Sequence, residues 1–424
     1  MRKILTLSLV IILAAGIFLS GCAPTPPPTP PSAPKPEALK GPTGDPIKFG
    51  AVLPLADITG QQASKAMQLA VKEINAAGGV LGRPLEVIIA DDEAKGEKGA
   101  AAIDKLATVD NVYAFIGGMS SGVHMAQLPV LKKYAKPTVW IGAAASAVIE
   151  TPMAEQSWYF HLHPWDYQQT GGYIDGFKEI MAKNPQIQLK KWFIGYEEGA
   201  FGTAGWRGFQ TLWPEQGWEV QGASFKSALL GGGDYRAALR QAKDYKPDAY
   251  LWLGYDADAL PMLEQAKEIG FAPPMFIGAP PGWPADFGKS PLAEGVSLFG
   301  MWAPSLKEVS KASKHFWDAY NTEFNEAPAT YFAPLGYTNV YVVANAINEA
   351  GSLDQDKVIA ALNATKYDSP VGEMLTIAPS RTLKTQGFTK QKILQWQKGV
   401  QQVIWPFDFK TAEPAYPFPA WDKR

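Results

Sequence analysis

Cysteine is almost absent from this chain, because its 424 residues contain only Cys22. With a single thiol no internal disulfide can form, so the folded part must be stabilised by packing alone. A charge excess of either sign is also absent, since 39 lysines and arginines stand against 41 aspartates and glutamates. Without a basic excess, the composition argues against a nucleic-acid partner.

Histidine is scarce, with four residues, and this counts against a hydrolase, which needs a nucleophile and a base within hydrogen-bond reach. Gly231-Gly232-Gly233 lacks the Lys-Ser/Thr of a phosphate-binding loop, and Gly-x-Ser-x-Gly does not occur. His161 and His163 share one face of a predicted strand, yet no nearby cysteine or histidine–glutamate cluster completes a metal site. We therefore expect no enzymatic activity, no catalytic residue, no cofactor and no metal.

The first 22 residues combine a basic start with a short apolar run. Arg2 and Lys3 precede residues 4–18, which are nearly uncharged but too short to form a lasting membrane span. Leu19-Ser20-Gly21-Cys22 then resembles the lipobox of bacterial lipoproteins, in which the cysteine receives a lipid after cleavage. The resemblance implies a signal peptide over 1–22, lipid attachment at Cys22 and an extracytoplasmic, membrane-anchored protein; a plain secretory signal is the alternative.

A proline-rich segment follows the cysteine. Residues 23–46 contain ten prolines, interleaved with Thr, Ser, Ala and Lys. Such a composition cannot bury apolar surface and favours extended polyproline II structure. We interpret it as a semi-rigid linker that holds a folded body away from the membrane.

The remaining part, about 380 residues long, is sufficient for two domains. Apolar, β-branched segments alternate there with segments of helical periodicity. We predict strands at 47–53, 85–90, 113–116, 138–141, 191–194, 249–253 and 275–277, and helices at 61–76, 99–107, 123–134, 206–213 and 260–269. This alternation predicts an α/β fold with parallel sheets covered by helices on both faces.

Ligands of such sheets bind beyond the carboxyl ends of the strands, so the loops at these ends are candidate sites. Residues 54–57, 117–122 and 142–146 follow predicted strands, and small residues let a ligand approach their backbone N–H groups. Ser120 and Ser121 stand at the start of a predicted helix, where free N–H groups favour an anion. A serine in this place can also serve only as a helix cap.

Several blocks within residues 47–406 match a known pattern. Residues 73–84 read Glu-Ile-Asn-Ala-Ala-Gly-Gly-Val-Leu-Gly-Arg-Pro, and residues 246–249 read Lys-Pro-Asp-Ala before a predicted strand. Residues 393–399 read Ile-Leu-Gln-Trp-Gln-Lys-Gly, followed by Val-Ile-Trp-Pro at 403–406. Together they resemble the leucine/isoleucine/valine-type solute-binding proteins of ABC importers.

The resemblance implies a type I periplasmic-binding-protein fold. Two doubly wound parallel-sheet lobes would be joined by three crossover strands, near residues 161–164, 300–303 and 376–387, with the ligand cleft between the lobes. The first lobe would contain residues 47–164 and 302–378, and the second would contain residues 165–301 and 379–424 with the C-terminal tail.

The implied partners are a small-molecule solute and an ABC permease in the membrane, with the solute-binding protein acting as a monomer. A ligand-sensing receptor that signals to a membrane partner is the main alternative, because a fold does not determine a function. A cell-surface hydrolase is the weaker alternative.

In the first lobe of this family, serine or threonine residues after the third and fourth strands hold the ligand carboxylate. Ser120, Ser121 and Ser146 match these positions, and Ala145 stands beside the last of them. The resemblance therefore implies that these four residues bind the anionic end of the solute.

In the second lobe, the family commonly has a tyrosine before a glycine. This chain has Phe201-Gly202 in that place, so the hydroxyl is missing. Tyr255 or Asp256 matches the polar or aromatic position after the next strand. We expect these three side chains, together with Trp283, to close over the other end of the solute.

The amino-acid binders of the family carry a glutamate after the following strand, where it pairs with the ligand ammonium. Residues 278–283 contain no acid, and Trp283 offers an apolar face instead. A buried ammonium without a carboxylate is costly, by about several kcal/mol. Either Asp256 or Asp57 replaces the glutamate, or the solute is an aromatic or aliphatic carboxylate or amide rather than a branched-chain amino acid.

Overall fold

Two β-sheets organise the part of the chain that the structure, a computed structural model, describes: residues 41–279, 283, 286–387 and 391–423. The signal peptide, Cys22 and most of the proline-rich linker that the sequence predicts lie outside these residues. Within the described ranges, no helix is both long enough and apolar enough to cross a membrane.

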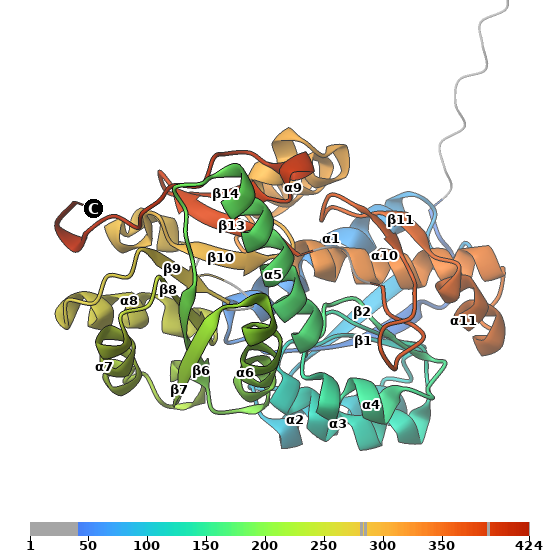
Figure 1. The fold of residues 1–424 in the computed structure, drawn as a ribbon. Helices are drawn as coiled ribbons and strands as arrows, with labels where there is room; N and C mark the ends of the chain where they lie inside the picture. The colour runs from blue at the N-terminus through green and yellow to red at the C-terminus, as the bar shows by residue number, and fades with distance from the viewer. Residues whose placement is uncertain (1–40, 280–282, 284–285, 388–390, 424) are drawn as a thin grey trace, which may run out of the picture. The chain divides into compact units, whose positions relative to one another are not determined.

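The first sheet has five parallel strands in the order β2-β1-β3-β4-β5. They are β1 (Ile47–Leu53), β2 (Leu85–Asp91), β3 (Ala114–Gly117), β4 (Thr138–Trp140) and β5 (Tyr159–His161). Helices α1 (Ile58–Ala76) and α10 (Phe332–Ala350) lie side by side on one face (Figure 1). Helices α2 (Gly96–Thr108) and α3 (Ser121–Tyr134) contact each other on the opposite face.

Alternation along β1 explains this arrangement. Phe49, Ala51 and Leu53 pack in the same core as the buried residues of α1 and α10, whereas Val52 packs with Ile103 of α2. Successive side chains of a strand point to opposite faces, so one apolar strand serves two helix layers. The smaller elements of this part are α4 (Glu150–Met153), α11 (Gln355–Asn363), β11 (Lys366–Asp368) and β12 (Met374–Thr376).

The second sheet has seven strands in the order β14-β13-β10-β9-β8-β6-β7. They are β6 (Lys191–Glu197), β7 (Glu219–Phe225), β8 (Ala249–Leu253), β9 (Met275–Gly278), β10 (Ser297–Gly300), β13 (Lys392–Gln397) and β14 (Val400–Trp405). Only the pairs that involve β13 are antiparallel among these described strands. The α/β class with two mostly parallel sheets, predicted from the sequence, is confirmed.

Large aromatic side chains fill both faces of the second sheet. Trp192 packs against Phe177 and Trp213, with ring centroids 5.2 and 4.4 Å apart. On the opposite face, Phe193 lies 5.9 Å from Tyr245. Phe177, Trp213 and Tyr245 thereby attach α5 (Asp166–Lys183), the end of α6 (Ala200–Leu212) and α7 (Arg236–Tyr245) to the sheet. Helix α8 (Ala259–Glu268) contacts α7, and α9 (Lys311–Phe324) packs beside α1.

Three chain segments link the two sheets and their helices: residues 162–165 after β5, residues 301–303 after β10, and the described residues 377–387 after β12, which pairs with β11 in a small separate sheet. The first and third run together. The His161 amide donates to the Thr385 carbonyl at 3.2 Å, and the Gly387 amide donates to the His161 carbonyl at 2.9 Å. Backbone pairing thus ties these connections to each other.

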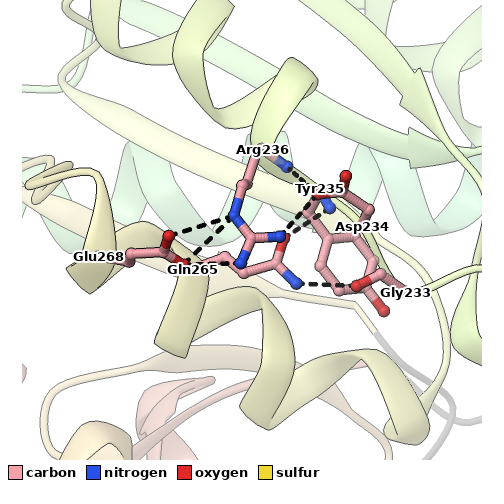
Figure 2. Close-up of polar contacts among 6 residues, drawn as sticks. All are labelled: Gly233, Asp234, Tyr235, Arg236, Gln265 and Glu268. Carbon is pink, nitrogen blue, oxygen red and sulfur yellow. Dashed lines mark hydrogen bonds and ion pairs between the residues drawn. The ribbon is translucent and has the colours of Figure 1, made fainter.

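Polar contacts hold the start of α7 to α8 (Figure 2). Gln265 donates to the Gly233 carbonyl at 2.8 Å and accepts from the Tyr235 amide at 2.7 Å. Arg236 forms an ion pair with Glu268 at 2.7 Å. The ion pair is exposed and contributes little, whereas the half-buried amide contacts fix the turn that precedes α7.

We expect Trp192→Ala to lower the free energy of unfolding by about 4 kcal/mol, because it empties the centre of an aromatic cluster. Trp317→Ala is the control, since Trp317 is only half-buried and its ring is covered by the Lys307 ammonium, 4.0 Å away. Urea denaturation followed by far-UV circular dichroism measures both variants. Equal losses for the two would contradict the central role of Trp192.

Candidate functional site

Segments at the carboxyl ends of strands from both sheets surround a small cavity. Its volume is about 20 Å³, enough for about one water molecule. From the first sheet come Met119 and Ser121 after β3, and two alanines after β4. From the second come Phe201 at the start of α6, Tyr255 after β8, Ala279 after β9 and Phe299 of β10. The cavity therefore lies where parallel sheets place their ligands.

The glycine turn after β3 brings Ser121 to the cavity. Gly117 and Gly118 have φ angles of +102° and +89°, and a Cβ on Gly118 would lie 1.9 Å from the indole of Trp140. Only glycine can make this turn. Ser121 is the first residue of α3, is 1% exposed, and accepts a hydrogen bond from the Ala145 amide at 3.2 Å. Ser121 and Ala145 therefore join the loops after β3 and β4.

Glu197 positions Phe201 on the other side of the cavity. Its carboxylate accepts hydrogen bonds from the Gly199 amide at 2.5 Å and from the Gly202 amide at 2.7 Å, at the start of α6. Gly202 has no room for a side chain, because a Cβ would lie 2.2 Å from the Glu197 carbonyl oxygen. Burial raises the pKa of Glu197. The rings of Phe201 and Tyr255 lie 5.9 Å apart.

Asp258 holds the loop that carries Tyr255. This fully buried carboxylate accepts from the Tyr255 amide and the Ala228 amide, each at 2.8 Å. It also accepts from the hydroxyls of Ser227, at 2.8 Å, and Tyr235, at 2.5 Å. The sequence analysis did not identify Asp258. It could have been found, because an aspartate three residues after Tyr255, at the start of an apolar helical segment, is a capping pattern.

The first connection between the sheets and α10 complete the cavity wall. The His163 Nδ1 donates to the Pro164 carbonyl at 3.0 Å, so its Nε2 accepts from the Tyr331 hydroxyl at 3.2 Å. Burial lowers the pKa of His163 to about 3, and the ring is neutral at pH 7. Gln169 and Phe332 lie beside it in the lining. His163 and Tyr331 were not among the site residues that the sequence predicts.

Three of the residues predicted to bind the solute line the cavity: Ser121, Phe201 and Tyr255. Ser120 and Ala145 lie directly behind the lining, because Ser120 hydrogen-bonds with the Tyr255 hydroxyl and the Ala145 amide with Ser121. The structure thus brings five of the eight predicted residues together.

The other three lie outside the lining of the cavity. Ser146 hydrogen-bonds with Asp166 and lines a separate surface hollow. Trp283 is 2% exposed and packs against Phe287, 4.4 Å away between ring centroids, within the core of the second sheet. Trp283 therefore does not offer its face to the cavity, as the sequence suggested, because neighbouring aromatic rings already cover it. Asp256 points to Asp57 instead of the cavity lining.

The lining is apolar and uncharged. Of its twelve described residues, five are aromatic and none is an aspartate, glutamate, lysine or arginine. Within the described ranges, no group of three or more histidine, cysteine, aspartate or glutamate side chains is arranged to hold a metal ion. The arrangement can enclose an apolar body and present hydroxyl and amide groups to a polar end.

Comparison with known proteins identifies relatives over nearly the whole described chain. The sequence profile of a family described as "Periplasmic binding protein" matches residues 46–399. A relative from Brucella abortus (strain 2308), named Leu/Ile/Val-binding protein homolog 7, is 23% identical over 396 residues. That match covers 87% of this chain and 94% of the relative.

Solved structures share the fold. A branched-chain amino acid transporter substrate-binding protein from Streptococcus pneumoniae, in complex with isoleucine, has a TM-score of 0.70 and 22% identity, covering 88% of this chain and 100% of its own. A solute-binding protein of an ABC transporter from R. palustris, in complex with benzoate, has a TM-score of 0.71 and 19% identity, covering 89% and 99%. Both neighbours bind solutes.

Asp258→Asn is expected to lower the free energy of unfolding by about 3 kcal/mol, because each carboxylate oxygen accepts from a backbone N–H, which can only donate, so the amide N–H₂ faces such a group in either orientation. The exposed variant Asp244→Asn, on α7, removes the same charge and serves as the control. Thermal unfolding at pH 7 measures both. An Asp258→Asn variant as stable as Asp244→Asn would show that these hydrogen bonds do not hold the loop.

Proposed function

The chain belongs to the periplasmic binding protein family, and on that premise we propose that it is the extracytoplasmic solute-binding component of an ABC importer. It captures a small solute between two lobes and delivers it to a membrane permease. The observation that carries this proposal is the cavity, which is lined by strand ends of both sheets and by the first connection between them.

The lobes of the proposal are the two sheets with their helices, comprising residues 47–164 with 302–378 and residues 165–301 with 379–424. Their loops meet directly: the Tyr255 hydroxyl hydrogen-bonds with Ser120, and α3 contacts α6. These contacts support a closed arrangement, and rotation at the three connections opens it. A solute that binds the closed form more tightly shifts the chain toward it.

The proposed solute has an apolar body and an anionic or polar end, as in an aromatic or aliphatic carboxylate or an amide. Five aromatic residues in the lining supply the apolar wall, and no described lining residue is an acid that could pair with an ammonium. The benzoate-bound neighbour supports this class. A branched-chain amino acid is the second candidate, favoured by the name of the Brucella relative.

The anionic end of the solute is assigned to Ser121 and the start of α3. This helix has fourteen residues, and the free N–H groups of its first turn favour an anion. Ser120 and Ala145 support this end from behind, while Phe201 and Tyr255 cover the apolar body. This assignment keeps five of the eight residues that the sequence predicts.

The wider setting follows from the N-terminal sequence. The proposal includes a signal peptide over residues 1–22, a lipid on Cys22 that anchors the protein at the membrane, and a monomeric state. A sensor of the same fold that signals to a membrane partner is the alternative. A hydrolase is disfavoured, because both ring nitrogens of His163, which lines the cavity, are already occupied.

Benzoate is expected to raise the melting temperature of the full chain, whereas leucine at the same concentration is not. A ligand at 100 times its dissociation constant stabilises by about 2.7 kcal/mol, which a thermal-shift assay detects. A shift with leucine alone would assign the site to amino acids, with Asp57 or Asp256 holding the ammonium. If no acid, amide or amino acid produced a shift, the importer proposal would fail.

Ser121→Ala is expected to weaken binding of the solute found in that assay at least tenfold, because the anionic end loses a hydrogen bond in a buried site. Ser146→Ala is the matched control. It removes the same hydroxyl from the next loop, outside the cavity lining, and leaves the affinity unchanged. Isothermal titration calorimetry measures both, and equal affinities for the two variants would overturn the assignment.

A further inference from the structure

Two aspartates from opposite sheets meet beside the cavity. Asp57 follows β1 and caps the start of α1, and Asp256 follows β8 and begins a short 3₁₀ turn. Their carboxyl groups are hydrogen-bonded to each other, and the residues are only 6% and 8% exposed. The contact therefore joins the two proposed lobes through a pair of acids.

Two carboxylates cannot share a hydrogen bond unless one of them keeps its proton. Asp57 acts as an acceptor on its own side, because it receives bonds from the Thr59 amide, at 2.8 Å, and the Thr59 hydroxyl. Asp256 Oδ1 is buried, and no N–H or hydroxyl group of the described residues donates to it. The shared proton accordingly belongs to Asp256, which donates to Asp57.

The surroundings favour this proton. Burial raises the pKa of Asp256 well above its usual range, with the Asp57 carboxylate adding to the effect and the Ala257 amide opposing it. The charged groups that raise the pKa of Asp256, Asp92 or Tyr255 are acidic: Asp57, Asp91, Glu197 and Asp258. Burial also raises the pKa of Asp92, to about 6.

We propose that Asp57 and Asp256 form a proton-binding site across the cleft, so that closure of the two lobes takes up one proton. The inference rests on the proposed function, because closure of the two lobes is the step by which the proposed importer component captures its solute. When the lobes separate, Asp256 returns to water and to an ordinary pKa of about 4. The proton is then released at neutral pH.

The direction of the pH effect follows from this difference. The pKa of Asp256 is higher in the closed form than in the open form. Closure is therefore fully favoured below a pH of about 4 and loses this support as the pH rises through the raised pKa of the closed form. Within that window, uptake of one proton changes the ratio of closed to open forms about tenfold per pH unit.

The test compares the full chain without any solute between pH 5 and pH 9. Small-angle X-ray scattering reports the radius of gyration, and carboxyl carbon NMR reports the titration of Asp256. The wild-type chain is expected to expand as the pH rises, with Asp256 titrating well above its ordinary range. The exposed variant Asp244→Asn keeps this behaviour.

Asp256→Asn is the decisive variant, because its amide donates to the Asp57 carboxylate at every pH. Its radius of gyration is expected to stay nearly constant from pH 5 to pH 9. Only the small change that titration of Asp92 causes should remain. In Asp57→Asn, the new amide at position 57 donates to the Asp256 carboxylate instead. This variant is expected to stay compact as well, and it replaces Asp256→Asn in the test if that variant does not fold. Circular dichroism confirms folding.

A wild-type radius that does not change with pH, or an Asp256→Asn variant that expands as the wild type does, would overturn the proposal. Compaction of the wild type at pH 9 by methylammonium or calcium chloride, but not by sodium chloride, would overturn it too, because a cation would then occupy the pair. No solute is present in these experiments, so failure to find a solute and failure of the proton site are separate results.

Discussion

A carboxyl group that is removed from water must collect hydrogen-bond donors or keep its proton, and this constraint shapes the cleft. Asp258 gathers backbone and hydroxyl donors and thereby fixes the loop after β8. Glu197 gathers the amides at the start of α6. Glu150 accepts from Ser380, Thr382 and Leu383 and holds the third connection to the first sheet. In each case the hydrogen bonds to a buried acid hold a loop or a connecting segment in one position.

Asp256 is the exception, because the donor it meets is a second acid. This exception has a consequence for the size of the cavity. Contacts such as those from Asp256 to Asp57 and from Tyr255 to Ser120 bring the sheets so close that about 20 Å³ is left between them. Benzoate or leucine is much larger than one water molecule, so either must enter while these contacts are broken. Solute entry and proton release are therefore parts of one opening movement.

The sequence predicted the strands well where apolar, β-branched runs are short and bounded by turns: the strand expected at 47–53 is β1 without change. It missed α10 because that helix is buried on nearly all sides and has no polar stripe to mark it. It missed β7 because alternate residues there are exposed and polar. Ser121 and Tyr255 could be found from the sequence, because ligands of parallel sheets bind beyond the carboxyl ends of the strands. Tyr331 could not be found in this way, because it precedes α10, a helix that packs on the first sheet from far along the chain.

The acids around the cleft and the proposed solute constrain each other. A carboxylate solute enters a site whose charged neighbours are acidic, and repulsion among them opposes closure. A proton on Asp256 removes one of these charges in the same movement that brings Asp57 close. Coupling between two ligands is reciprocal, so a proton that favours closure raises the affinity for the anion, and the bound anion raises the affinity for the proton to the same extent. A solute with an ammonium would supply the positive charge itself and would remove the need for the proton.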